Sequence, residues 1–302
     1  MRIRYIALSL LLFARCSFSE NSSGEKRTTG DLTSFQTSFD YAPEQPVNGK
    51  LLGIMELGYS GFNSFIVKMD NQDRWTLEKA LYSESHIGDG KVTFEYVLAE
   101  IERFKSEMIA FGVDGNNINF VASSSAIRDQ KVVGIAEQLR RLDIGLITVS
   151  VTQEGTYALH ATVPKSLLED AYMIDIGSGN TKVSWYENGQ AQTLETYGSR
   201  YKEVGVSDQE ARIGIKDAVA QVPSRNRNLC FMVGKIPFLL ATLTDNRSKR
   251  YTVLEPPDAY SFADAQSQAG LNLYDALWEE ATISYVFDWD SNYSIGVLMN
   301  VN

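Results

Sequence analysis

The chain has 302 residues, of which 44% are hydrophobic and 22% are charged, and its formal net charge is −10. This is an ordinary globular composition with enough apolar material for a sizeable core, and the length fits one large domain or two small ones. The negative charge argues against a basic surface for nucleic acid, so we expect no nucleic-acid partner.

The first residues predict export rather than a part of the fold. Arg2 and Arg4 precede an apolar run at residues 6–14, which is too short to span a bilayer. Small residues at positions 17–19 have the spacing that signal peptidase prefers. Residues 1–19 are therefore predicted to be a signal peptide, and the protein is expected in the periplasm or cell envelope.

Cys16 leaves a second interpretation of this leader open. A cysteine just after an apolar run can accept a lipid, which would be the protein's one link to the membrane, but Arg15 is a poor residue before such a cysteine. The stretch that follows, residues 20–48, is rich in Ser, Thr, Gly and Asn and lacks a hydrophobic period. We expect this stretch to be a disordered tether.

The first half of the folded region mixes strand and helix patterns. Short alternating or continuous apolar runs predict strands, and apolar residues at helical spacing predict helices. The predicted strands are 51–57, 65–69, 75–82, 118–122 and 145–150, and the predicted helices are 94–111 and 129–142.

The same pattern then begins again. The predicted strands are 171–176, 182–186, 191–196, 229–233 and 294–299, and the predicted helices are 208–222, 238–243 and 271–281. Repetition of strand, glycine turn, strand, strand, helix and strand predicts two similar α/β lobes, at residues 50–168 and 169–302, with a cleft between them. Each lobe is expected to be a mixed sheet with helices on its faces, and the last helix could return to the first lobe. Cys230, alone in an apolar strand, is expected to be a core residue.

Two glycine turns open the two halves. Residues 56–61 read Glu-Leu-Gly-Tyr-Ser-Gly, and residues 175–181 read Asp-Ile-Gly-Ser-Gly-Asn-Thr. Glycine lets the backbone turn tightly and bring N–H groups close to an anion, and the hydroxyl groups can add donors. The predicted phosphate-binding residues of the two loops are Gly58, Ser60, Gly61, Gly177, Ser178, Gly179 and Thr181. One such loop alone would be read as a β-hairpin turn, but two matched loops favour a ligand that carries phosphate.

These loops and one further segment resemble the exopolyphosphatase/guanosine pentaphosphatase (Ppx/GppA) family, within the actin, Hsp70 and sugar-kinase superfamily. The family motifs Asp-Leu/Ile-Gly-Ser-Asn-Ser-Phe, Ala-Thr-Ser-Ala-x-Arg-Asp and Ile-Asp-Ile-Gly-Gly-Gly-Ser-Thr-Glu have counterparts at residues 56–62, 123–129 and 174–182. These read Glu-Leu-Gly-Tyr-Ser-Gly-Phe, Ser-Ser-Ser-Ala-Ile-Arg-Asp and Ile-Asp-Ile-Gly-Ser-Gly-Asn-Thr-Lys. A Gly-Ser-Arg at 198–200 matches a later Gly-Ala-x-Arg segment. The resemblance spans about residues 51–300, with no motif identical but the order preserved.

The resemblance implies two RNase H-like lobes of the actin-like ATPase type and hydrolysis of a phosphoanhydride in polyphosphate or a guanosine polyphosphate. It implies a Mg²⁺ ion near Glu56 and Asp175. Arg128 and Arg200 are the expected phosphate-contacting cations, because guanidinium groups match phosphate oxygens, although each could instead be a surface arginine. A homodimer is left open.

The departures from the family motifs weaken the expected chemistry. The family's proposed base lies in Gly-x-Glu-Glu-Ala-Arg, and in the register we prefer its last Glu falls on Thr156. Glu154 is the nearest acid and the candidate base, but two residues along a helix turn a side chain by about 200°. Lys182 replaces the Glu that ends the second loop, where it could bind phosphate or face solvent. Glu56 is one methylene longer than the family's Asp, and with Glu154 and Asp175 it completes the expected catalytic acids.

Two functions therefore stay open from the sequence. The chain is either a divergent hydrolase of phosphoanhydrides or a catalytically impaired protein of the cell envelope that binds phosphate, polyphosphate or a nucleotide.

Overall fold

The computed structural model describes residues 38–245, 247–280 and 284–301, all within one compact unit. The predicted signal peptide, Cys16 and most of the predicted tether lie outside the described residues. Within these ranges no helix is long and apolar enough to cross a membrane.

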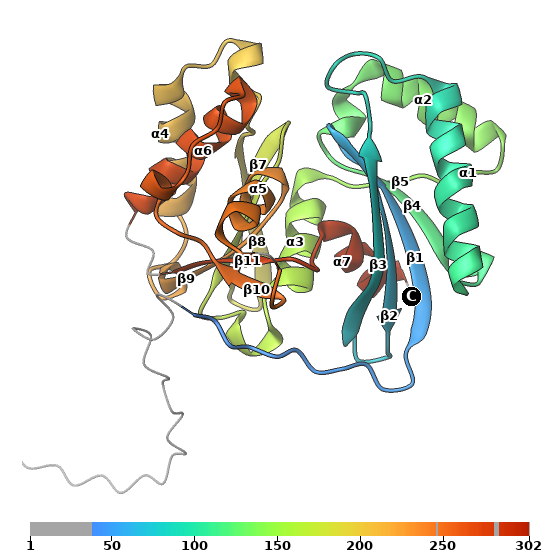
Figure 1. The fold of residues 1–302 in the computed structure, drawn as a ribbon, viewed down its shortest axis with the longest axis horizontal. Coiled ribbons are helices and arrows are strands. Elements are labelled where there is room, and N and C mark those ends of the chain that lie inside the picture. The colour runs from blue at the N-terminus through green and yellow to red at the C-terminus, as the bar shows by residue number, and fades with distance from the viewer. Residues whose placement is uncertain (1–37, 246, 281–283, 302) are drawn as a thin grey trace, which may run out of the picture. The chain divides into compact units, whose positions relative to one another are not determined.

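The first sheet has the strand order β3-β2-β1-β4-β5 (Figure 1). Its three N-terminal strands pair antiparallel, and β4 and β5 run parallel to β1. The strands are β1 (Lys50–Leu57), β2 (Gly61–Met69), β3 (Trp75–Glu84), β4 (Ile118–Ala122) and β5 (Ile147–Thr148). Helix α1 (Phe94–Phe111) joins β3 to β4, and α2 (Gln130–Arg141) joins β4 to β5.

The second sheet repeats this arrangement, with the order β10-β11-β9-β6-β7-β8. Its strands are β6 (Tyr172–Ile176), β7 (Asn180–Glu187), β8 (Gln190–Tyr197), β9 (Leu229–Val233), β10 (Tyr251–Val253) and β11 (Ser284–Asp288). Its helices are α4 (Asp208–Ala220), α5 (Lys235–Thr244) and α6 (Ala265–Trp278). In both sheets three antiparallel strands are followed by a helix and a parallel strand beside the first, so the predicted duplication and the two-lobed α/β fold are confirmed.

Local signals explain why the helices begin and end where they do. The Thr93 side chain caps α1 by accepting from the Tyr96 N–H, and Gly112, at φ 111°, ends it in the left-handed conformation. Val97, Ile101, Phe104 and Met108 form its buried face at helical spacing, against the outer face of the first sheet. A capping box of Ser150 and Gln153 starts α3 (Val151–Thr162).

Helices α3 and α7 (Tyr293–Val301) pack on each other, and their apolar residues share one core with both sheets. Helix α3 follows the first sheet in sequence but packs on β6, β7 and β8, and α7 follows the second sheet but contacts β1 (Figure 1). The predicted first lobe, 50–168, therefore contributes a helix to the second sheet.

Several elements differ from the prediction. The predicted strand at 294–299 is wrong, because these residues form α7; a short buried apolar run has no period that separates strand from helix. The predicted strand at 145–150 is reduced to β5, and α3, β10 and β11 were not predicted. Phe39, within the predicted tether, is buried and packs edge-on against Phe231 and Tyr251. Cys230 is a buried free thiol, as predicted.

Candidate functional site

The acids of the two glycine loops lie on the faces of their strands that look toward the shared core. Side chains alternate along a strand, so Glu56 shares a face with Leu52 and Ile54, which belong to the core between the sheets. Asp175 likewise shares a face with Met173 of the same core. The period of two along β1 and β6 thus brings both acids to one region.

A cavity of about 580 Å³ opens at this region. We call it the interlobe pocket, because it is lined by both glycine loops and by the beginnings of α5 and α7. Of the predicted site residues, those that line it are Glu56, Gly58, Ser60, Gly61, Glu154, Asp175, Gly177 and Ser178. Its other wall carries large apolar side chains: Phe65, Tyr82, Phe238, Leu239, Phe287 and Trp289.

Both glycine loops are tight hairpin turns closed by a backbone hydrogen bond. The Gly58 N–H donates to the Gly61 carbonyl at 2.8 Å, and the Gly177 N–H donates to the Asn180 carbonyl at 3.1 Å. These two N–H groups are therefore committed to the turns. Within the described chain, the Ser60 hydroxyl is buried without a hydrogen-bond partner. A ligand oxygen is the kind of partner that such a hydroxyl lacks.

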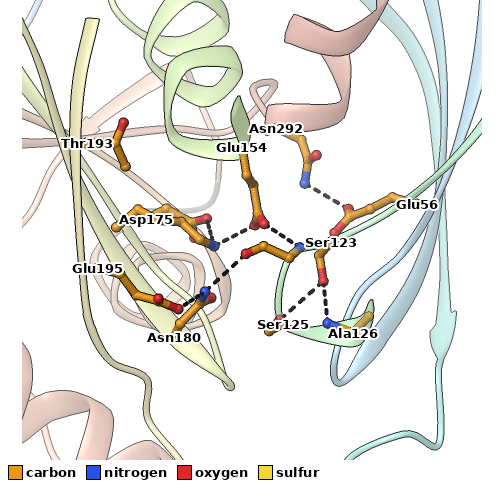
Figure 2. A network of polar contacts seen from close by, with 12 residues as sticks. Glu56, Ser123, Ser125, Ala126, Glu154, Asp175, Asn180, Thr193, Glu195 and Asn292 are labelled. Atoms are coloured by element: carbon orange, nitrogen blue, oxygen red, sulfur yellow. Dashed lines mark hydrogen bonds and ion pairs between the residues drawn. The ribbon is translucent and has the colours of Figure 1, made fainter. Parts of the chain in front are cut away.

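Glu154 reaches into the pocket from α3, and Thr156 does not line it. The Glu154 carboxylate is buried, with Oε2 accepting from the Ser124 N–H at 2.6 Å and Oε1 accepting from Lys182 Nζ at 2.5 Å. Figure 2 shows it descending from α3 to lie between Asp175 and Ser123. Of the two residues considered for the position of the base, Glu154 therefore faces the pocket and Thr156 does not.

Gly155 explains how Glu154 comes so near the second sheet. A Cβ atom at Gly155 would lie 2.4 Å from the Thr193 side chain and 2.6 Å from the Ser184 hydroxyl. Only a residue without a side chain lets α3 rest this closely on β7 and β8, and this contact sets the height of the carboxylate above the sheet.

Lys182 is buried and faces the pocket, so it is not a solvent-facing strand residue. It stands directly beside Asp175 on β6 and Glu195 on β8 in the strand register. Its Nζ donates to Asp175 Oδ2 at 3.0 Å and to Glu154 Oε1. Burial alone lowers the pKa of Lys182, but attraction to Asp175 and Glu154 outweighs it and raises that pKa above its ordinary value. The ammonium is therefore charged at physiological pH.

Glu56 has different surroundings from the other two acids. Its Oε2 accepts from the side-chain amides of Asn63, at 3.0 Å, and Asn292, at 3.1 Å. Burial raises the pKa of Glu56 to about 7; the Asn63 hydrogen bond opposes the shift, and repulsion from Glu154 and Asp175 adds to it. Near neutral pH this carboxyl group is thus divided between its two protonation states.

Solved structures with a similar fold are known. A Ppx/GppA family member from Aquifex aeolicus matches with a TM-score of 0.62 and 14% identity, covering 83% of this chain and 97% of that one. An exopolyphosphatase from Cytophaga hutchinsonii matches with a TM-score of 0.59 and 17% identity, covering 84% and 99%. The chain has the Ppx/GppA fold. No protein-family model matches the sequence, and no curated protein matches it.

The likeness confirms, at the level of the fold, the resemblance to the Ppx/GppA family that the sequence motifs indicate. At these identities it establishes the fold, and the chemistry of the site rests on the residues of this chain.

The Mg²⁺ ion that the sequence resemblance implies near Glu56 and Asp175 does not fit the residues present. The ammonium of Lys182 occupies the space between the oxygens of Glu154 and Asp175, where an ion would need ligands at about 2.0–2.1 Å. The Glu56 carboxylate is held by two amide groups instead. No group of three or more His, Cys, Asp or Glu side chains in the described ranges could hold a metal ion.

The two predicted phosphate-binding arginines join the lobes and do not line the pocket. Arg128 pairs with Glu195 of the second sheet at 2.8 Å. Arg200 donates to the Gly88 carbonyl of the first lobe at 2.7 Å, pairs with Glu203 and lies over the Tyr59 ring. Both guanidinium groups are thus committed to protein contacts.

Two other predicted phosphate ligands serve the fold. The Thr181 hydroxyl is buried and donates to the Tyr197 carbonyl at 2.7 Å. Gly179 lies outside the pocket lining, and a Cβ there would stand 2.8 Å from Ser125 Cβ, so it allows the second loop to touch the first lobe. Asn180 strengthens this contact by donating to the Ser124 hydroxyl at 3.2 Å.

None of the predicted site residues comes from α5 or α7, although both helices begin at the pocket. Lys235 and Gly234 line the pocket at the start of α5, where no side chain caps the helix. Asn292 and Tyr293 line it at the start of α7, and the buried Tyr293 hydroxyl has no hydrogen-bond partner among the described residues. Asn292 precedes α7, and its side chain accepts from the Ser294 N–H. An asparagine at this position is a helix-start signal, and it could have indicated α7 from the sequence.

Proposed function

We propose that the chain binds a phosphate-bearing anion in the interlobe pocket and hydrolyses it weakly or not at all. The observation that carries the proposal is the pair of buried salt bridges from Lys182 to Glu154 and Asp175. They leave the two glycine loops in place while they engage the carboxylates that a hydrolase would use.

Glu154 is poorly placed to activate water. Oε2 is held by the Ser124 N–H, and a water that approaches Oε1 must compete with the charged Lys182 donor at 2.5 Å. A general base in phosphoryl transfer has to accept a proton from the attacking water, so it needs an accessible oxygen. Displacing Lys182 would leave a buried charge unpaired, which costs several kcal/mol.

The pocket keeps groups that suit an anion. The start of α5 presents backbone N–H groups without a side-chain cap, and an uncapped helix N-terminus attracts negative charge. The exposed Lys235 side chain stands at that same start, and the unpartnered Ser60 hydroxyl lies on the first loop. These donors come from both lobes, so one phosphate group could be held by both.

Titration calorimetry with inorganic phosphate and pyrophosphate tests the proposal. We expect saturable binding that K235A weakens by about tenfold to a hundredfold, because a charged hydrogen bond contributes roughly 1.5–3 kcal/mol. The matched control is K105A, which removes an exposed lysine from α1 and should leave the affinity unchanged. If neither inorganic phosphate nor pyrophosphate binds at high millimolar concentration, the proposal is contradicted.

Hydrolysis of a phosphoanhydride is the second candidate, and Glu56 is the observation that favours it. A carboxyl group with a pKa of about 7 that lines the pocket is suited to exchange protons with a bound water. Its Oε2 is fixed by Asn63 and Asn292, and both amides leave Oε1 to a water. If the chain is a hydrolase, Glu56 and not Glu154 is its base.

Phosphate release from polyphosphate and from guanosine pentaphosphate separates the two candidates. The binding proposal predicts release no faster than that of the E56Q variant. Release that E56Q abolishes but E84Q retains would establish the hydrolase instead, because Glu84 lines the same pocket but is exposed.

We also propose that the protein acts outside the cytosol, on the strength of its leader sequence. Mass spectrometry of the mature protein should find an N-terminus near residue 20, or a lipid on Cys16. An intact Met1 in the mature protein would contradict export.

A further inference from the structure

The three charged groups at the floor of the pocket are arranged as two ligands around one cation. Glu154 comes from α3 and Asp175 from β6, and both carboxylates point at the same Lys182 nitrogen. All three side chains are buried. Two buried carboxylates that face one point repel each other strongly unless a positive charge lies between them.

We infer that Lys182 is a tethered replacement for a divalent cation: its ammonium occupies a cation position formed by Glu154 and Asp175, so neither the fold nor the pocket needs a metal ion. The inference concerns the same pocket as the proposed function. Only its phosphate-binding experiment rests on that function, and the metal experiments on K182A do not. The position of the cation is set by the strand register of Asp175 with Lys182 and by the height of α3.

The inference has a direct consequence for a shortened side chain. Truncating Lys182 to alanine leaves two carboxylates and the volume of three methylenes and an ammonium, which is enough for an ion with bound water. Carboxylate and water oxygens are the ligands that Mg²⁺ and Mn²⁺ prefer. K182A should therefore acquire a metal site that the natural chain does not have.

Thermal unfolding of the purified chain tests this. The melting temperature of the natural chain should be the same in EDTA and in Mg²⁺ or Mn²⁺. K182A should melt lower in EDTA and rise by about 5 °C at Mn²⁺ concentrations near 100 times the dissociation constant. K182A/D175N should lose that rise, since it lacks one of the two ligands.

K235A is the matched control, because Lys235 lines the same pocket but is exposed and contacts neither carboxylate. It should show no response to Mn²⁺. If K182A does not fold, K182S is the second variant, since its hydroxyl leaves the space open and adds an oxygen ligand. The inference is overturned if both variants stay unfolded at saturating Mn²⁺ or fold without a Mn²⁺ response.

A metal response of the natural chain that D175N removes would also overturn the inference. When phosphate binding to the natural chain is measured by calorimetry, the affinity should be the same in EDTA and in Mg²⁺. Binding only with Mg²⁺ would contradict the inference and leave the proposed function standing. No binding in either buffer would contradict the proposed function and leave the response of K182A to decide the inference.

Discussion

Helices α3 and α7 pack backbone against backbone at Gly296 and Tyr157. A Cβ atom on Gly296 would lie 2.1 Å from the Tyr157 carbonyl oxygen and 2.7 Å from its Cα. Backbone atoms cannot move away as the end of a flexible side chain can. This contact therefore fixes the distance between α3 and α7, which share one core with both sheets. The positions of Glu154 on α3 and Asn292 before α7 depend on it.

We expect G296A to destabilise the protein by about 2–3 kcal/mol, because overpacking against a rigid backbone forces the helices apart. Gly134 offers the matched control: it lies in α2 and has no atom within 4 Å of a built Cβ. G134A should stabilise the protein by about 0.5–1 kcal/mol through higher helix propensity. Equal effects of the two substitutions in urea unfolding would contradict the packing argument.

Glu56 should make stability fall as the pH rises toward neutrality. Its pKa is about 7 in the folded protein against about 4.5 in the unfolded chain, so between these values the folded state holds a proton that the unfolded state has lost. At about 1.4 kcal/mol per pKa unit, this costs the folded state roughly 3 kcal/mol by pH 7.

The E56Q variant isolates this contribution. Its free energy of unfolding relative to the natural chain should increase from pH 4.5 to pH 7 and level off above that. E137Q, an exposed substitution on α2, should show no such trend. A difference between E56Q and the natural chain that does not vary with pH would rule out the shifted pKa.

Arg128 should matter little to stability and not at all to phosphate binding. Its guanidinium pairs with Glu195 but is 56% exposed, and exposed ion pairs contribute about 0–1 kcal/mol. R128A should therefore lower the free energy of unfolding by less than about 1 kcal/mol and keep the affinity for inorganic phosphate. A tenfold loss of affinity in calorimetry would restore Arg128 as a ligand-contacting residue.

Asp288 should be critical to folding, although it does not line the interlobe pocket. It is fully buried and accepts two hydrogen bonds from Arg250, each 3.0 Å long, while that guanidinium lies 4.2 Å from the centre of the Trp75 ring in the first lobe. Removing one partner leaves a buried charge unpaired, so D288N should cost about 3–5 kcal/mol.

The neighbouring pair gives the comparison for D288N. Asp290 pairs with Arg247 at 2.7 Å with both side chains partly exposed, so D290N should cost less than about 1 kcal/mol. Chemical denaturation of both variants measures the difference. A loss of similar size in the two would mean that burial does not govern the Arg250–Asp288 pair.

The sequence by itself determined the duplicated fold and the place of the two loops. The strand and helix periods, the glycine turns and the motif order are local signals. They can be recognised in the sequence without knowledge of the tertiary contacts. From these signals the sequence predicted the strands β1 and β6, which carry Glu56 and Asp175 near their ends. It also predicted α1 with its observed bounds. Local signals failed at residues 294–299, where a short buried run has no distinguishing period.

Tertiary structure alone decided what the site residues do. Whether Glu154 or Thr156 faces the pocket depends on the rotation of α3, which is set by Gly155 against β8 and by Gly296 against Tyr157. Whether Lys182 meets solvent or two carboxylates depends on α3 covering its strand face. Both contacts join residues far apart in the chain, and no local pattern encodes the burial that fixes their charge and pKa.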